Sequence, residues 1–214
     1  MRLLTLALAL LLVAAVAGCG GGPRVTETRE VPSFDRLEIS DSVDVEVTPG
    51  DSREVLVTAG EDVIDRVHTE SSGGVLNIDI VDRGIVIGND PLDDVRIQVS
   101  AGALEAVRVD GAGDVKLTGL DRDALDLEIN GSGDIQASGT VGSLVARVDG
   151  AGDADLSALE ARTARVTVDG AGDAELHVTE RLDVSVDGAG DVSYRGDPAV
   201  TSSVEGAGDL RHED

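Results

Sequence analysis

Residues 125–135 read LDLEINGSGDI, and this stretch decides the fold. Leu125, Leu127 and Ile129 alternate with acidic or polar residues, a period of two that is typical of a β-strand with one buried face. The phrase Gly-Ser-Gly-Asp then occupies residues 131–134, and the next apolar residue is Ile135. The stretch therefore predicts a strand, a glycine-rich interruption and a second strand in close succession.

The same phrase, Gly-(Ala/Ser)-Gly-Asp, recurs through the second half of the chain. Its copies are separated by 20, 19, 20, 18 and 18 residues and begin at Gly111, Gly131, Gly150, Gly170, Gly188 and Gly206. One such copy cannot bury its apolar row alone, so stacking of several is required. We therefore expect an all-β fold, a right-handed parallel β-helix (β-solenoid) with coils of 18–20 residues, its hand following from the rule for parallel crossovers.

Residues 31–100 carry the strand pattern without the regular phrase. Val43–Val47 and Val75–Ile80 alternate apolar and polar residues between turns rich in Gly, Pro, Asn and Asp. We predict one β-helix domain over residues 32–211, with regular repeats over 104–211. Its core must be built from Val, Leu, Ile and Ala, because the chain has one Phe, one Tyr and no Trp.

Two structural roles are open for the repeated glycines. If a strand runs through the phrase, both glycines point inward, where a Cβ would collide with the neighbouring coil. Alternatively, glycine supplies a positive φ at a corner of the coil.

Stacked coils would also align acidic residues in two columns. The first column is Asp110, Asn130, Asp149, Asp169, Asp187 and Glu205; the second is Asp114, Asp134, Asp153, Asp173, Asp191 and Asp209. Like charges about 5 Å apart repel by only about 1 kcal/mol per pair in water, but the repulsion adds up along a column. Turn N–H groups, nearby arginines such as Arg108, Arg147 and Arg165, or calcium could offset it. Calcium is therefore the one cofactor considered, with the second column as its candidate site.

The formal charge of −25 limits the partners of the chain. Nucleic acid is not expected, because phosphate binding requires cationic patches and Lys116 is the only lysine. The acidity fits a well-hydrated surface, and it also fits adaptation to high salt or binding of divalent cations.

The first residues, MRLLTLALALLLVAAVAGC, have the features of an export signal. Arg2 precedes an apolar run of signal-peptide length, and residues 16–19 resemble the bacterial lipobox. The resemblance implies removal of residues 1–18 and acylation of Cys19, the only cysteine, as a membrane anchor. We expect residues 19–31 to comprise the lipidated cysteine and a flexible tether. The mature protein would then lie in the cell envelope, in the outer membrane if the host has two membranes.

With its glycine phrases and the opening residues Phe34–Leu37 and Val43–Val47, the chain resembles the putative autotransporter adhesin, head GIN domain family. The resemblance covers roughly residues 32–209 and implies a parallel β-helix on the cell envelope. It implies no catalytic residues.

The expected function is non-catalytic: a lipid-anchored envelope protein whose repetitive acidic surface serves adhesion, partner binding or envelope structure. Its partner, a protein or a glycan, is not specified by the residues, and the open ends of a solenoid allow a homo-oligomer. A calcium-dependent binding or stabilising module is the alternative. A polysaccharide-acting enzyme is the third class, disfavoured because no nucleophile–base pair can be nominated.

Overall fold

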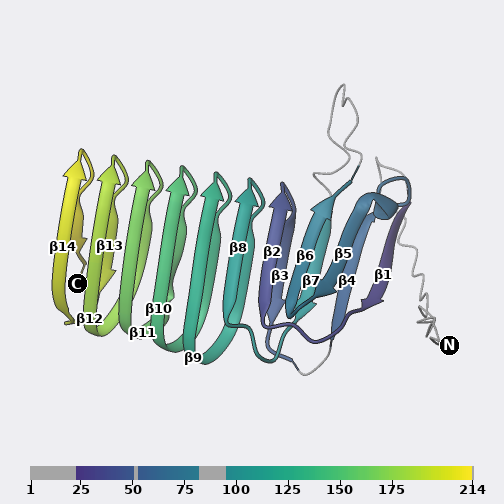
Figure 1. Ribbon diagram of the computed structural model, residues 1–214, viewed down its shortest axis with the longest axis horizontal. Coiled ribbons are helices and arrows are strands. Elements are labelled where there is room, and N and C mark those ends of the chain that lie inside the picture. Colours follow the sequence, from purple (N-terminus) through teal and green to yellow (C-terminus); the bar gives the residue numbers. More distant parts are fainter. Residues whose placement is uncertain (1–22, 51–52, 82–94, 214) are drawn as a thin grey trace.

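The computed structural model describes residues 23–50, 53–81 and 95–213, and their regular secondary structure is almost entirely β-strand. Fifteen strands belong to one continuous sheet that winds into a solenoid (Figure 1). The strands are β1 Arg24–Glu30, β2 Arg36–Asp41, β3 Asp44–Thr48, β4 Glu54–Gly60, β5 Val67–Ser72, β6 Val75–Ile80, β7 Arg96–Ser100, β8 Ala106–Gly111, β9 Val115–Gly131, β10 Ile135–Gly150, β11 Ala154–Gly170, β12 Ala174–Gly188, β13 Val192–Arg195, β14 Ala199–Gly206 and β15 Leu210–His212. The only helical element in the described ranges is a 3₁₀ turn, η1, at Ile64–Arg66.

The repeats stack in parallel and in register, as the sequence predicts. Strand β10 pairs with β11 so that Val148, Asp149 and Gly150 lie beside Val168, Asp169 and Gly170 of the next coil. Each neighbouring pair from β9 to β12 repeats this arrangement. The all-β solenoid with one glycine phrase per coil is confirmed; its right-handed winding stays a prediction.

The core is a thin stack of aliphatic side chains inside the coils. Alternate residues of each strand point inward, as shown by Leu125, Leu127 and Ile129, which are at most 2% exposed. No polar or charged residue is buried in the part of the chain that the structure describes. The two aromatic residues, Phe34 and Tyr194, only pack against the edge of this core. Small aliphatic residues suit it because coils one strand spacing apart leave little depth.

The first coils do not lie in the order of the sequence. Strands β2 and β3 form a coil that lies between the coil of β6 and β7 and the coil of β8 and β9 (Figure 1). The first coil in the sequence is therefore an internal one, and the coil that follows it in the sequence lies on its outer side.

Three antiparallel strands cover this end of the solenoid. Strand β4 pairs with β7, β5 pairs with β6, and β1 pairs with the outer edge of β4. A turn at Gly73 and Gly74, both with positive φ, reverses the chain between β5 and β6. These three antiparallel strands, which we call the cap, contribute their own apolar side chains to the core, including Val55, Val57 and Val67, which are at most 2% exposed.

Strand β1 differs from the predicted tether over residues 19–31. Residues 24–30 pair with β4 along their whole length, and Arg29 donates hydrogen bonds to the main-chain oxygens of Ile64 and Val67. The Val25 side chain packs on the core. The edge of β4 offers a template that a segment of Thr and Val residues can join. The signal at 1–18, Cys19 and the glycines after it lie outside the described residues.

Candidate functional site

The glycine phrase forms a corner in each coil that carries it, and both of its glycines are required there. The first, such as Gly150, has a φ of 132°, a conformation that side-chain-bearing residues rarely adopt. The second, such as Gly152, lies so close to the previous coil that an added Cβ would overlap the carbonyl oxygen of Gly133. A Cβ on Gly150 would also overlap the carbonyl oxygen of Gly131, so the first glycine meets both requirements considered from the sequence, whereas the second meets only the close-approach requirement.

The aspartate of the phrase links each coil to the next. Its main-chain N–H donates a hydrogen bond to the carboxylate of the equivalent aspartate in the preceding coil; for Asp173 and Asp153 the distance is 2.8 Å. The same bond joins all six predicted aspartates, with distances of 3.3, 2.9, 2.8, 2.7 and 2.9 Å along Asp114, Asp134, Asp153, Asp173, Asp191 and Asp209. We call this column the aspartate ladder.

Beside each of these bonds, a main-chain hydrogen bond runs in the opposite direction, from one coil to the aspartate carbonyl of the following coil. The N–H of Ala154, the residue after Asp153, donates to the carbonyl oxygen of Asp173 at 2.9 Å. A hydrogen bond to a charged acceptor contributes about 1.5–3 kcal/mol, against a repulsion of about 1 kcal/mol between neighbouring exposed carboxylates. The bonds therefore outweigh the repulsion, and turn N–H groups provide the offset that the sequence offered as one of three.

The ladder has a seventh member that the sequence did not reveal. Asp44 accepts the N–H of Asp114 at 3.3 Å, and the segment Asp41-Ser42-Val43-Asp44 occupies the place of a glycine phrase. Asp41 takes the position of the first glycine and has a φ of 76°, the only positive φ of a non-glycine residue in the described ranges. Without its glycines this copy is invisible to a motif search, although Asp-x-x-Asp before Val45 was a faint signal.

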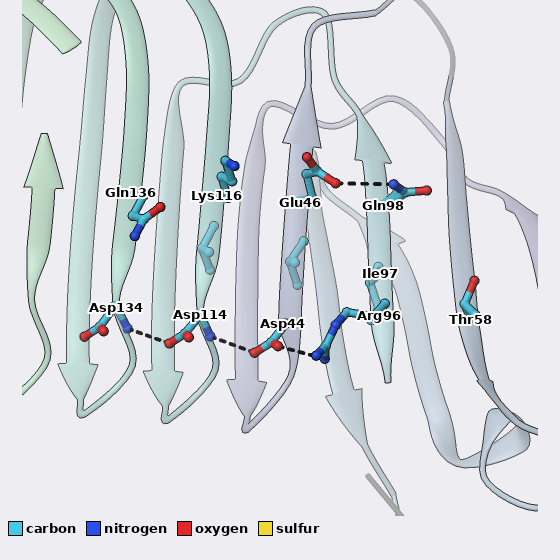
Figure 2. A pocket seen from close by; sticks show the side chains of 12 residues that line it. Asp44, Glu46, Thr58, Arg96, Ile97, Gln98, Asp114, Lys116, Asp134 and Gln136 are labelled. Carbon is cyan, nitrogen blue, oxygen red and sulfur yellow. Dashed lines mark hydrogen bonds and ion pairs between the residues drawn. The ribbon is translucent and has the colours of Figure 1, made fainter. Parts of the chain in front are cut away.

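An arginine lies at each end of the ladder. Arg96 forms an ion pair with Asp44 at 2.8 Å (Figure 2). At the other end Arg211 contacts Asp191 at 2.8 Å and Asp209 at 2.9 Å. The hydrogen bonds that Arg211 donates to Asp209 and Asp191 raise the pKa of its guanidinium. The aspartate ladder therefore has a cation at each of its two ends.

The first acidic column is also aligned in register, from Asp110 to Glu205. Asn130 breaks it: its amide donates to Asp110 at 2.9 Å. Arg108 contacts Asp110 at 2.8 Å and Glu128 at 2.9 Å, and its hydrogen bond is the main reason that the pKa of Asp110 is lowered. The other two predicted arginines pair elsewhere, Arg147 with Asp126 and Arg165 with Asp183.

The ladder does not create an evident metal site. Among the described residues no three His, Cys, Asp or Glu side chains are grouped so that they could share a metal ion. One oxygen of each of the carboxylates Asp114, Asp134, Asp153, Asp173 and Asp191 already accepts an N–H. Calcium binding is the untested alternative, and titration decides it.

A groove of about 540 Å³ lies on the outer face of the sheet where the ladder begins. Strands β3, β4, β7, β9 and β10 contribute its walls (Figure 2). Two rows of side chains cross these strands. One row is the ladder from Arg96 through Asp44 to Asp134, and the other contains Gln98, Glu46, Lys116 and Gln136.

The second row holds the unused polar groups of the groove. Gln98 donates to Glu46 at 3.3 Å, whereas the ammonium of Lys116 and the amide of Gln136 have no side-chain hydrogen bond or ion pair within the described chain. A ligand lying across the strands would therefore meet a cation, an amide and carboxylates within one shallow depression. In the sequence Lys116 stands out only as the sole lysine, and no sequence pattern brings residues 44–46, 96–98, 116 and 136 together.

The histidines offer no shared centre. His68 lies beside Asp79 at 3.1 Å in the antiparallel cap, and the ring of His212 stacks on Tyr194 with centroids 4.9 Å apart at the opposite end. His177 lies on β12. No helix in the described part of the chain is both long and apolar enough to cross a membrane.

Comparison with known proteins agrees with this architecture. A family model described as "putative auto-transporter adhesin, head GIN domain" matches residues 33–198. No curated protein matches the sequence.

Solved structures share the fold. A putative adhesin from Bacteroides fragilis is 20% identical, with a TM-score of 0.67 over 89% of this chain and 97% of that one. A putative lipid binding protein from Parabacteroides distasonis is 19% identical, with a TM-score of 0.54 over 92% and 98% of the two chains. A putative adhesin from Parabacteroides merdae is 16% identical, with a TM-score of 0.52 over 93% and 99%.

Proposed function

Because the chain belongs to the putative auto-transporter adhesin, head GIN domain family, we propose that it is a non-catalytic adhesion protein of the cell envelope. In this role Cys19 carries the acyl chains that hold it in the membrane, the outer membrane where the host has two. The signal-like residues 1–18 and the single cysteine directly after them support the anchor. The solenoid then projects its lateral faces away from the lipid, where a partner can reach them.

The groove at the start of the aspartate ladder is the binding face in this proposal. The observation that carries it is the pair of unused groups, Lys116 and Gln136, within the depression. In the next two coils the corresponding positions are acidic, because Gln136 is followed in register by Asp155 and Glu175, before Ser193 and Arg211. A partner with both acceptor and donor groups, such as a polar glycan or a protein loop, can therefore engage the groove while the acidic positions beside it repel anions.

The test is binding of the purified chain from Pro23 onward, which contains all described strands, to immobilised envelope glycans and envelope proteins. Lys116→Ala combined with Gln136→Ala removes the two unused groups. Arg165→Ala is the matched control, since it removes one cation from a different column of the coils, where its contact with Asp183 is long at 3.7 Å. We expect the double variant to weaken binding about tenfold or more and the control to leave it unchanged.

Equal binding by all three proteins, or no binding to any envelope component, would overturn the assignment of the groove. The anchor is tested separately by feeding cells a radiolabelled fatty acid. We expect label on the native chain and none on Cys19→Ser. Absence of label on the native chain would refute lipid anchoring and leave the groove proposal standing.

A further inference from the structure

The two ends of the solenoid are finished differently. At the end near the N-terminus, β4 and β5 lie antiparallel on β7 and β6 and cover their edges. At the other end, the outermost coil is formed by the short β15 and by β14, and all eight residues of β14 are exposed. No described strand pairs with its outer edge. Its main-chain N–H and C=O groups on that side are therefore available for pairing.

Strand β14 also leaves part of the core uncovered. Val200 and Val204 continue the internal stacks of Leu182 and Val186 in β12, which are at most 1% exposed. The two valines themselves are 38% and 40% exposed. They are two of the three large hydrophobic residues that are exposed in the described part of the chain.

The strand lacks the devices that keep an edge from pairing. Its sequence, AVTSSVEG, contains no proline or lysine, and its one charge, Glu205, is next to the last residue. Thr, Ser and Val also favour extended backbone. At the N-terminal end of the same molecule, antiparallel strands already complete the parallel coils, so an antiparallel neighbour is compatible with this sheet.

From these features we propose that two copies of the chain pair through β14, antiparallel and related by a two-fold axis. With the axis at Ser202, Val200 of one copy lies opposite Val204 of the other, on the core side in both. On the outer side Thr201 lies opposite Ser203, and Glu205 opposite Ala199, so no like charges meet. A shift by one residue would turn the valines of the second copy to the outer face.

The two-fold axis makes this pairing a closed one, because both copies use the same edge. A head-to-tail contact would join two different edges, and such contacts form filaments. In the two-fold pair the β14 edge of each copy is occupied by the other, so association through this edge stops at two copies. The formal charge of −25 on each chain opposes the approach, and salt screens that repulsion. The dimer is therefore expected to form more tightly as NaCl is raised.

Analytical ultracentrifugation of the chain from Pro23 onward tests the proposal. We expect a dimer whose dissociation constant falls as NaCl is raised from about 20 to about 500 mM, the range over which the screening length becomes short. Val204→Lys should weaken the dimer about tenfold or more, because an inward-pointing lysine blocks edge pairing. Thr201→Lys, on the outer face of the same strand, is the control and should remain dimeric. Circular dichroism melting establishes that both variants are folded.

Cysteine cross-linking examines the register. The chain from Pro23 onward has no cysteine, and Ser202 lies opposite itself across the proposed axis, within disulfide range. Ser202→Cys should form a covalent dimer under mild oxidation, whereas Ser157→Cys on β11 should not. A monomer at all salt concentrations would overturn the proposal. A dimer that Val204→Lys leaves intact and that Ser202→Cys does not cross-link would overturn it equally.

Discussion

Replacing Gly152 by alanine probes the closest approach between two coils. Gly152 lies in the middle of the repeats, at the corner between β10 and β11. An added Cβ would overlap the carbonyl oxygen of Gly133 and lie 3.1 Å from its carbonyl carbon and 3.0 Å from Cγ2 of Ile129. Ordinary contact begins near 3.4 Å. Since the carbonyl belongs to the main chain of the neighbouring coil, a side-chain rotation cannot relieve the overlap.

The cost follows from the bonds on either side of this glycine. Ala151 donates to the carbonyl of Gly131 at 2.8 Å, and Asp153 donates to the carboxylate of Asp134 at 2.9 Å. Separating the coils by about 1 Å would break both, because hydrogen bonds weaken steeply beyond normal length. The bond to the Gly131 carbonyl contributes about 1 kcal/mol and the bond to the Asp134 carboxylate about 1.5–3 kcal/mol. With about 1–2 kcal/mol of overpacking strain, the loss is about 3.5–6 kcal/mol. For a chain of this size that corresponds to a fall in Tm of about 10–20 °C.

Urea unfolding and thermal melting of the chain from Pro23 onward measure this loss. Ala151→Ser, at the exposed middle position of the same phrase, is the matched control and should change stability by less than about 0.5 kcal/mol. Gly208→Ala creates the same overlap with Gly190 in the last coil, where only one neighbour must move, so we expect a smaller loss. A change below about 1 kcal/mol for Gly152→Ala would refute the close-approach explanation.

Three further outcomes are expected. Asp153→Asn keeps an oxygen that accepts the N–H of Asp173 but removes the charge repulsion with the aspartates of both neighbouring coils. The Tm of this variant minus the Tm of the native chain should therefore be largest at about 20 mM NaCl and should decline toward about 500 mM. A difference in Tm that does not change with salt would contradict the ladder electrostatics. Because the pKa of Asp110 is lowered in the folded state, mainly by Arg108, its contribution is present above the unfolded pKa and is lost as pH falls through the folded one. The Tm advantage of the native chain over Arg108→Ala should therefore be constant near neutral pH and shrink below about pH 4, and growth of that advantage in acid would show the sign to be wrong. Calcium at millimolar concentration should leave the Tm unchanged at low salt, with magnesium as the control, and a rise specific to calcium would establish a site that the N–H-bonded carboxylates do not suggest.

The position of β2 and β3 shows that the order of the coils in space can differ from their order in the sequence. The coil formed by β2 and β3 is the first in the sequence, but its neighbours are β6 and β7 on one side and β8 and β9 on the other. The chain leaves this coil, builds the antiparallel β4 and β5, and returns to add β6 and β7. The cap therefore ends up outside the coil that precedes it in the sequence, which closes one end of the stack.

The repeats were determined by the sequence alone. A phrase such as Gly131–Asp134, recurring at the length of one coil, leaves one way to align equivalent residues, and stacked identical residues then fall in register. The strand positions, the aliphatic core and both acidic columns follow from that local pattern. The bonding role of the aspartates was one of three alternatives that the sequence left open, and the N–H bonds between coils decided it.

Only the tertiary structure decided the features that depend on distant segments. Arg96 and Asp44 are far apart in sequence, and their ion pair exists because β7 and β3 become neighbours. The groove, the cap and the seventh rung arise in the same way, from a choice among strand edges that are all suitable for pairing. The residues of these strands carry no repeated motif that would specify which edges pair. The pairing depends on which long-range arrangement buries the most apolar surface, and no local sequence pattern determines this.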